Sequence, residues 1–543
     1  MPLTTLRMQV LKACRRLLSE ENRDPYSPAY GCFDRRFWGW KIVDYPEATL
    51  QRNAYPLAWL LEHPDPCFEI KADILTEAVQ AALSFSACIQ HRDGSFDQAF
   101  PHEHSFGATA FLLHSLLEAF RSIREISQAE FLGTIESCLQ RGADFLCRHD
   151  EQHGRITNHL AGAALSLRKT GDYFGVPRYK KRSDELVERV MASQSAEGWF
   201  PEYEGSDPGY QTLCLYYLAR IYHLQPDSQL KTTLERAVEF LSWFAHPDGT
   251  FGGEYGSRRT AIFYPGGLAL LAREIPLAGS LFHFMAGAIV KGLTVTLNDV
   301  DVVNVAPVLE NYIAVLDVGA VKQEEGNIPL PCQRAMAKRD FAEAGIYVRK
   351  TGRYYALFGT SNGGVLKVFD CRQKNAIWND SGYVGQTSAG DYITTQVTDL
   401  DRPCKLGEND VCVETAFFSL SRSSPTPGAF VLLRLMNLTL MRSIRVGNYI
   451  KKQLVNLLIR AKRQTPLNLS RTVQFGEEKI IVTDRIKGCL PMRWIECGRP
   501  FVAIHMASAR YFEGAAGTAA WKPRRVDVDA LNRYGNLEHR FEI

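Results

Sequence analysis

The sequence lacks the marks of a disulfide-bonded, exported or membrane-spanning protein. Its 13 cysteines are an odd number, are spread from Cys14 to Cys497 and include no Cys-x-x-Cys pair, so neither a disulfide framework nor a zinc ribbon is expected. No run of 18 apolar residues occurs, although a transmembrane helix needs about that length. The opening segment is an amphipathic helix pattern broken by Lys12, Arg15 and Arg16, not a signal peptide. We therefore expect a cytoplasmic location.

The sequence also has little excess of charge of either sign. Its net charge is only +3 over 543 residues, so no whole-molecule attraction to nucleic acid or to a strongly acidic polymer is expected. A hydrophobic content of 45% and a charged content of 23% are typical of a soluble globular protein. The length predicts two or more domains. Recognition of an anion must therefore depend on local groups.

The first half of the chain shows apolar residues at helical spacing, in paired segments. A loop with a glycine and usually an aromatic residue recurs between the pairs, roughly every 50 residues, which indicates a helical array. The markers are Gly94, Gly154, Gly198 and Gly249. The helix after each loop is rich in Ala, Gly and Ser, as a crowded inner layer requires, whereas the helix before it is more charged. We predict an (α/α) toroid over residues 1–295, with its loops framing a central cleft.

After about residue 295 the pattern changes to β-branched and aromatic residues broken by Gly, Asn and Asp. The segment "AGIYVRKTGRYYALFGT" predicts two strands around a turn at Thr351–Gly352, and "GAFVLLRLMNL" is among the later segments that we interpret as strands. Many short strands without helical repeats predict an antiparallel β-sandwich over residues 296–543. The fold class is thus α+β and multidomain.

Two polar residues open an otherwise small and apolar helix, "TNHLAGAALSL". Asn158 is a suitable N-cap, and this position would put both Asn158 and His159 on the cleft side of an inner helix. The next inner helix opens with Tyr210 after a Pro-Gly break, about one repeat later. Adjacent inner helices should therefore bring these three side chains to one rim. A lone histidine on an apolar helix is more often a core residue, and that alternative stays open for His159.

A third loop, "GGEYGSRRTAIFYPGG", offers charged groups at the mouth of the following inner helix. An arginine fork made by Arg258 and Arg259 would hold a carboxylate, with Tyr255 beside it. A surface charge pair is the alternative interpretation.

These motifs together resemble the heparinase II/III-like polysaccharide lyases and their relatives among alginate lyases and uronyl C5-epimerases. The resemblance rests on the Asn-His pair that opens one inner helix, the Gly-Tyr-Gln that opens the next, and the β-rich second half. It implies that Asn158, His159 and Tyr210 are catalytic and that Gln211 binds substrate. It also implies a Tyr or His from the β-domain that reaches over the cleft. Candidates are Tyr383, His505 and Tyr511.

The chemistry implied by this resemblance is removal of the C5 proton of a uronic acid. The adjacent carboxylate already carries the charge that the carbanion must spread, so neutral or cationic donors must stabilise an enediolate. A tyrosine can act as the base when a nearby cation favours its phenolate. Loss of the 4-O substituent then gives β-elimination, whereas return of a proton to the opposite face gives epimerisation. The expected function is a lyase, with a C5-epimerase as the alternative.

Two further segments are candidates for substrate contacts. The stretch "YGCFDRRFWGWKIVDYPEATLQRN" combines Trp38 and Arg36 with other aromatic and basic residues, which suits an anionic sugar. An aromatic plug that closes the ring is an equally good interpretation. His104, in the His-x-His of "AFPHEHSFG", is interpreted as a cleft-lining residue because no third metal ligand is evident at a known spacing. No cofactor is expected, and a structural divalent metal stays open.

Residues 442–463 carry seven basic and no acidic residues, interleaved with apolar ones. A solvated edge of the β-domain is one interpretation, and peripheral contact with anionic lipid is the other. The second would place the enzyme at the inner face of the membrane, acting on a cell-surface polysaccharide intermediate. The predicted partner is an anionic polysaccharide or oligosaccharide, and no nucleic acid is expected.

Two rival functions remain at this stage. Helical toroids also host glycoside hydrolases, and the loops are rich in carboxylates; hydrolysis needs two of them across the scissile bond. The candidates are Asp93, Asp97, Glu197, Glu202, Glu204, Asp207 and Glu254. A non-catalytic glycan-binding protein is the second rival.

Overall fold

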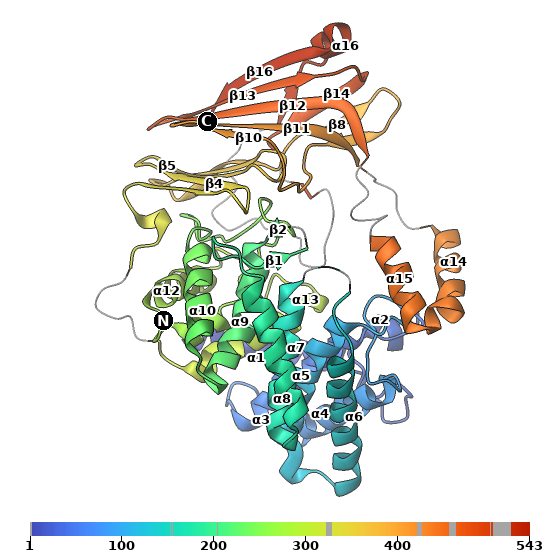
Figure 1. The fold of residues 1–543 in the computed structure, drawn as a ribbon. Coiled ribbons are helices and arrows are strands. Elements are labelled where there is room, and N and C mark those ends of the chain that lie inside the picture. Colours follow the sequence, from blue (N-terminus) through green and yellow to red (C-terminus); the bar gives the residue numbers. More distant parts are fainter. Residues whose placement is uncertain are drawn as a thin grey trace.

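A computed structural model describes residues 3–152, 154, 156–203, 205–321, 328–420, 426–455, 463–499, 501–502 and 523–543. The N-terminal half is a ring of helices, and the C-terminal half is two stacked β-sheets (Figure 1). The helices of the ring are α1 (Leu3–Glu20), α2 (Arg35–Trp38), η1 (Ala48–Asn53), α3 (Ala54–Glu62), α4 (Ala72–Ile89), α5 (Phe106–Ile123), α6 (Ala129–Arg148), α7 (Thr157–Phe174), α8 (Pro177–Ala192), α9 (Pro208–Leu224), α10 (Ser228–Ser242), α11 (Gly266–Leu271), α12 (Pro276–Lys291) and α13 (Val302–Val318).

The ring is closed by its inner helices. Each of α3, α5, α7, α9, α11 and α13 packs against the next, and α13 returns to pack against α3. Small residues make this crowding possible in α7, where residues 161–167, mostly Ala, Gly and Ser, are all buried. Residues 208–219 of α9 are also all buried. Helices α4, α6, α8, α10 and α12 form the outer layer of the ring, and α8 buries only one stripe of its surface. The predicted toroid is confirmed.

The recurring glycines are required by the contact between each loop and a neighbouring outer helix. Gly94 and Gly198 both have φ of +96°, and a Cβ atom at Gly94 would lie 2.0 Å from the carbonyl oxygen of Arg141 in α6. Gly31 repeats the arrangement against Ala81 of α4. A side chain at these positions would collide with backbone and would strain a left-handed turn. The repeat therefore begins one unit earlier than the sequence pattern indicated.

The C-terminal half contains two antiparallel sheets, so the predicted sandwich is confirmed. The first is β3 (Ala337–Phe341), β4 (Ile346–Lys350), β5 (Tyr354–Gly359), β6 (Val365–Asp370) and β7 (Asn375–Asp380), paired in that order. The second runs in the order β15 (Arg524–Val526), β14 (Met492–Cys497), β8 (Val384–Thr387), β9 (Tyr392–Thr394), β11 (Asp410–Leu420), β12 (Gln464–Phe475), β13 (Ile480–Lys487) and β16 (Asn536–Glu542), with β10 (Cys404–Leu406) also paired to β11. A short helix α16 (Asp529–Tyr534) precedes β16.

The five-stranded sheet is the middle layer of the molecule. Along β5, Tyr355 and Leu357 belong to the hydrophobic core of the toroid, whereas Tyr354, Ala356 and Phe358 belong to the core between the two sheets. This alternation follows from the two-residue period of a strand. Both faces of β5, at the centre of the sheet, are therefore buried, and the sheet joins the two halves.

The predicted domain boundary at residue 295 is too early. Helix α13 follows it and packs against α1, α3 and α11, so the helical half continues to Val318. One ring helix, α4, is long and apolar enough to cross a membrane, but 44% of it is buried inside the fold, where it packs against α3, α5 and α6.

The segment "GAFVLLRLMNL" is helical, which corrects its interpretation as a strand. It forms α14 (Pro427–Leu438), with Pro427 at the first turn and Thr426 accepting a hydrogen bond from the Ala429 amide as N-cap. Helix α15 (Ile444–Val455) follows, and the pair is inserted between β11 and β12 beside the toroid (Figure 1). Residues 456–462 of the basic segment lie outside the described part, as do His505 and Tyr511.

Candidate functional site

Asn158 does not cap its helix. The N-cap of α7 is Ile156, and Asn158 lies within the first turn. Its backbone amide and its side-chain Nδ2 both donate to Oε1 of Glu202, at 3.1 and 2.6 Å. Glu202 belongs to the hairpin of β1 (Pro201–Glu202) and β2 (Gly205–Ser206), in the loop before α9. The amide of Asn158 is thus held by a carboxylate from the next repeat.

Arg258 links this carboxylate to Tyr210. Its Nη1 lies 3.2 Å from Oε2 of Glu202, and its guanidinium carbon lies 3.6 Å from the centre of the Tyr210 ring. Burial acts to lower the pKa of Arg258, but Tyr210 and Glu202 outweigh it and hold the pKa above its usual value. The guanidinium therefore stays charged in a site where Glu202 is fully buried.

Asp207 positions both Tyr210 and Arg258. One of its oxygens accepts from the Tyr210 amide at the start of α9, and the other accepts from the amides of Arg258 and Thr260. Burial raises the pKa of Asp207 to about 6, against the lowering effect of these hydrogen bonds. One buried carboxyl group therefore fixes the helix start and the arginine loop relative to each other.

His159 lies beside Asn158 but has different partners. Its Nδ1 is 2.6 Å from Oε2 of Glu151, and its ring packs edge-on against Phe111 of α5. The imidazole lies directly against Gly107, where a Cβ atom would be 2.5 Å from Nδ1. The structure thus joins Asn158, Arg258 and Tyr210 in one chain of contacts, and it places His159 next to Asn158 with a carboxylate on its Nδ1.

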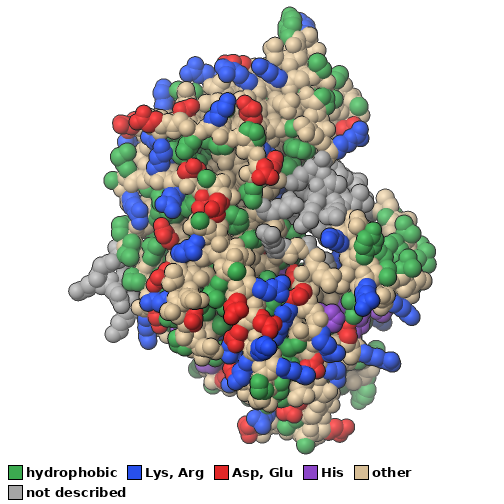
Figure 2. Space-filling view, in the orientation of Figure 1, with side chains coloured by type: hydrophobic (Ala, Val, Ile, Leu, Met, Phe, Trp, Pro, Cys, Tyr) green, Lys and Arg blue, Asp and Glu red, His purple; other side chains and the backbone are tan. Residues whose placement is uncertain are grey.

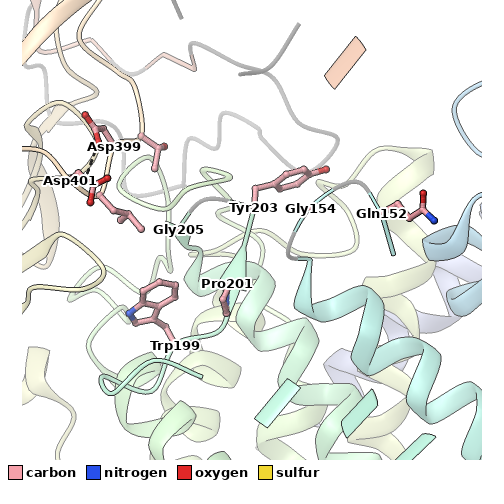
Figure 3. Close-up of a pocket in the computed structure, with 10 residues that line it drawn as sticks. Gln152, Gly154, Trp199, Pro201, Tyr203, Gly205, Asp399 and Asp401 are labelled. Atoms are coloured by element: carbon pink, nitrogen blue, oxygen red, sulfur yellow. Dashed lines mark hydrogen bonds between the residues drawn. The ribbon is translucent and has the colours of Figure 1, made fainter. Parts of the chain in front are cut away.

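A cavity of about 630 Å³ lies next to this cluster. It is bounded on one side by toroid loops and on the other by a β-domain loop (Figure 3). Tyr203 lines the cavity, and the guanidinium carbon of Arg258 lies 5.0 Å from the centre of its ring, so Tyr203 connects the cavity with the cluster. The lining residues are Gln152, Gly154, Trp199, Pro201, Tyr203, Gly205, Thr398, Asp399, Leu400 and Asp401. The volume falls in the range of small-ligand pockets.

The predicted arginine fork is divided between two environments. Both arginines are buried, but only Arg258 pairs with Glu202. Arg259 has φ of +58°, and burial lowers its pKa to about 10. Tyr255 is also buried, and its hydroxyl lies 2.9 Å from Nε2 of His246, so its side chain does not line the cavity.

Gln211 has a structural role that the sequence did not reveal. Its side-chain nitrogen Nε2 donates to the carbonyls of Gly198 and Ala237, and its Oε1 accepts from the Phe200 amide. All these partners are backbone groups of a loop and an outer helix. The prediction that Gln211 binds substrate is therefore wrong, because its amide is buried and occupied.

Tyr383 is not at the cleft. It is fully buried between the sheets, its hydroxyl donates to Asp484 at 2.7 Å, and Arg471 lies over its ring. The prediction of a catalytic role for Tyr383 is wrong, because a buried phenol of the sandwich core cannot reach a substrate bound by the toroid. Burial, and next the charge of Asp484, raise the pKa of its hydroxyl well above the usual range.

The remaining predicted residues precede α3 and α5: Arg36 and Trp38 lie in the short helix α2, and His104 lies in the loop before α5. Arg36 pairs with Asp34 and Glu47, and the indole nitrogen of Trp38 donates to the carbonyl of Glu20. His104 lies 2.9 Å from Asp93. Contacts of these residues with a substrate stay a prediction.

Sequence reasoning did not single out Glu202, Glu151 or Tyr203. Glu202 stood only among the loop carboxylates, because nothing in its spacing shows that it pairs with both Asn158 and Arg258. Tyr203 has φ of +61°, which is an uncommon backbone conformation for an aromatic residue. No sequence pattern predicts this conformation.

Comparison with known proteins agrees with the resemblance inferred from the sequence. Residues 69–268 match the family model of the ulvan lyase N-terminal domain. The fold resembles a chondroitin AC lyase from Streptomyces coelicolor A3, solved with chondroitin sulphate, at a TM-score of 0.55, 11% identity, and coverage of 91% of this chain and 67% of that chain. It also resembles a heparinase III at a TM-score of 0.51, 11% identity, and coverage of 90% and 72%. No curated protein sequence matches. The resemblance to heparinase-like polysaccharide lyases is confirmed.

Proposed function

We propose that this chain, a polysaccharide lyase by its ulvan lyase N-terminal domain and its fold, removes the C5 proton of a uronic acid in an anionic glycan and eliminates the 4-O-linked sugar. The observation that carries the proposal is the position of Arg258 between Glu202 and Tyr210, beside the amide of Asn158. The cation of Arg258, the amide of Asn158 and the phenol of Tyr210 are thereby grouped next to a cavity that residues of both halves line.

The roles follow from the charges. The cation of Arg258 stabilises the phenolate of Tyr210 over the phenol, which suits Tyr210 as the base that takes the C5 proton. The electron pair left at C5 forms the C4–C5 double bond as the C4–O bond breaks, and the leaving oxygen takes up a proton. The developing negative charge on the uronate carboxyl group needs donors, for which the N–H groups of Asn158 and of the His159 imidazole are suited.

The rival glycoside hydrolase finds less support, because most loop carboxylates already have structural partners. Glu197 accepts from the amides of Glu343 and Ala344, and Glu254 pairs with Lys367. Asp207 and Glu202 are buried and bonded as described above, and Asp93 and Asp97 lie beside histidines. Glu204 lies outside the described residues. A hydrolase needs two carboxyl groups that face the bond, one of them able to accept water.

The proposal is tested with uronate-containing polysaccharides and the full chain. We expect products that absorb in the ultraviolet through an unsaturated uronate, and loss of this absorbance in Tyr210→Phe. Incubation in deuterated water separates the alternatives: label at C5 without cleavage means an epimerase. Clean reducing ends without the absorbance mean a hydrolase. Full activity of Tyr210→Phe would overturn the assignment of the base.

We further propose that the pair α14–α15 makes peripheral contact with an anionic membrane. Large apolar side chains are exposed along it, and they include Phe430, Val431, Leu432, Leu435, Leu438, Leu440, Val446 and Tyr449. This patch is visible over α14 in Figure 2. Arg442, Arg445 and Lys452 are exposed beside it. Apolar residues next to cations suit the boundary between headgroups and acyl chains.

Flotation with vesicles tests this contact. We expect the wild-type chain to float with vesicles that contain phosphatidylserine and to stay in solution with neutral vesicles. The double variant Leu432→Ser/Leu435→Ser should lose the binding while it keeps lyase activity on a soluble glycan. Equal behaviour with both vesicle types would exclude the contact.

A further inference from the structure

Three histidines converge in the loop that leads into α5. His91 lies near the start of this loop, just after α4, and His102 and His104 lie near its end. Their donor nitrogens all lie within 4.8 Å of one another, and all three residues are partly exposed. The rings of His91 and His104 lie with their centres 4.3 Å apart and are tilted by 34° to each other. Along the sequence only His104 in the His-x-His pair was singled out, because His91 lies near the start of the same loop and approaches the pair only in the folded chain.

Two of the three imidazoles have a carboxylate at their second ring nitrogen. Nδ1 of His104 lies 2.9 Å from Asp93, and Nε2 of His91 lies 2.8 Å from Asp97. Carboxylates placed in this way fix the tautomer and the ring orientation of metal-binding histidines. They leave Nε2 of His104 and Nδ1 of His91 as the nitrogens for a ligand.

The loop backbone is organised around Asp97. The amides of His102, Glu103 and His104 all donate to its carboxylate, at 2.8, 2.8 and 3.0 Å. His102 and His104 have φ of +60° and +51°, a conformation uncommon for residues other than glycine. Such backbone conformations are strained and cluster at functional sites.

We propose that His91, His102 and His104 bind a divalent transition metal ion of the zinc class at the edge of the candidate active site. Three imidazoles suit zinc, copper, iron or nickel better than magnesium or calcium. An ion held at about 2.0–2.1 Å from each nitrogen would draw the rings slightly closer together and leave one position for water.

The position of the loop gives the ion a structural role. Glu103, between two of the ligands, pairs with Lys451 of α15, and Lys451 also lies over the ring of Phe100. At its other end the loop leads into α5, where Gly107 touches the imidazole of His159. The ion therefore fixes a loop that connects the inserted helices of the β-domain with the candidate active site.

Metal titration of the full chain tests the proposal. After chelation, and after alkylation of the exposed thiols of Cys67, Cys88, Cys404 and Cys489, Co²⁺ is added as the probe. We expect one equivalent to bind with the visible absorption bands of a nitrogen-ligated ion. Zn²⁺ should displace it and should slow hydrogen exchange of the amides in residues 97–105.

The variants are chosen to keep the fold. His102→Asn and His104→Asn suit the left-handed backbone, since Asn tolerates positive φ, and each should weaken Co²⁺ binding at least tenfold. His223→Asn, at an exposed position on α9, is the matched control and should bind as the wild type does. Equal binding by all variants, or absorption typical of thiolate ligands only, would overturn the site. Failure here leaves the lyase proposal untouched, because the readouts are spectral and not catalytic.

Discussion

The guanidinium of Arg258 lies 3.6 Å from the centre of the Tyr210 ring and is held there by the buried carboxylate of Glu202. Lysine cannot reproduce this contact, because its ammonium is a point charge without a planar face. We expect Arg258→Lys to lower kcat by about 100-fold, the usual cost of losing one group that stabilises developing charge.

The control for this variant is an arginine–tyrosine pair away from the cavity. Arg124 lies over the ring of Tyr173 at 5.5 Å, and Arg124→Lys should leave kcat unchanged. If both substitutions lower kcat equally, the proposal that Arg258 acts in catalysis through Tyr210 is contradicted.

Gly107 is predicted to be essential for the orientation of His159. A methyl group at this position would lie 2.5 Å from Nδ1 of the imidazole and would displace it from Glu151. We expect Gly107→Ala to lower kcat/KM by about 100-fold, since a small displacement of a positioned group can have this effect. Steady-state kinetics measure the change.

The matched substitution is Gly133→Ala in α6, where nothing lies within 4 Å of the new methyl group. It should keep full activity and raise the free energy of unfolding by about 1 kcal/mol through helix propensity. Undiminished activity of Gly107→Ala would contradict the placement of His159.

The pH dependence of stability should carry a contribution from Asp207. Its pKa is about 6 in the folded chain, against 3.8 for the free side chain, so between these values the folded chain holds a proton that the unfolded chain has released. The free energy of unfolding therefore falls as pH rises through this window, by about 3 kcal/mol from this group.

Urea unfolding of the wild type and of Asp207→Asn measures this contribution. The difference in unfolding free energy between the two chains should change between about pH 4 and about pH 7, with the wild type losing more on the alkaline side. A difference that is the same at both pH values would show that Asp207 does not titrate in this range.

Tyr383→Phe is expected to affect stability and not catalysis. The substitution removes a hydroxyl that donates to Asp484 at 2.7 Å inside the sandwich. Loss of a hydrogen bond to a charged group costs about 1.5–3 kcal/mol. The melting temperature should fall while kcat stays at the wild-type value, in contrast to Tyr210→Phe. A large fall in kcat would restore Tyr383 as a candidate.

The architecture followed from periodicity, since the helical and strand patterns each extend over hundreds of residues. The exact boundary did not, because α13 is as apolar as a buried strand and only its packing against α1 and α11 assigns it to the ring. The segment of α14 was wrongly predicted as a strand for the same reason, because a short apolar run is compatible with a strand or a helix. In the structure the segment is helical, with Thr426 as its N-cap.

The site could be predicted only in part. Asn158, His159 and Tyr210 were found because they interrupt apolar helix starts, which is visible along the chain. Glu202 pairs with residues 44 and 56 positions away, and such pairings depend on tertiary structure. Tyr383 and Gln211 were misplaced because a polar residue in a loop or at a helix start serves packing as readily as it serves a substrate.

The sheet β3–β7 has one more consequence, for attempts to study the halves separately. Tyr355 and Leu357 pack in the core of the helical half, whereas Ala356 and Phe358 pack in the core between the sheets. The five-stranded sheet is therefore part of both hydrophobic cores. A fragment that ends before Ala337 would expose to water the apolar surface of the toroid that the sheet covers. A fragment that starts there would expose the apolar face of the sheet that packs on the toroid. Dissection should therefore yield insoluble pieces, and heat or denaturant should melt both halves in one step.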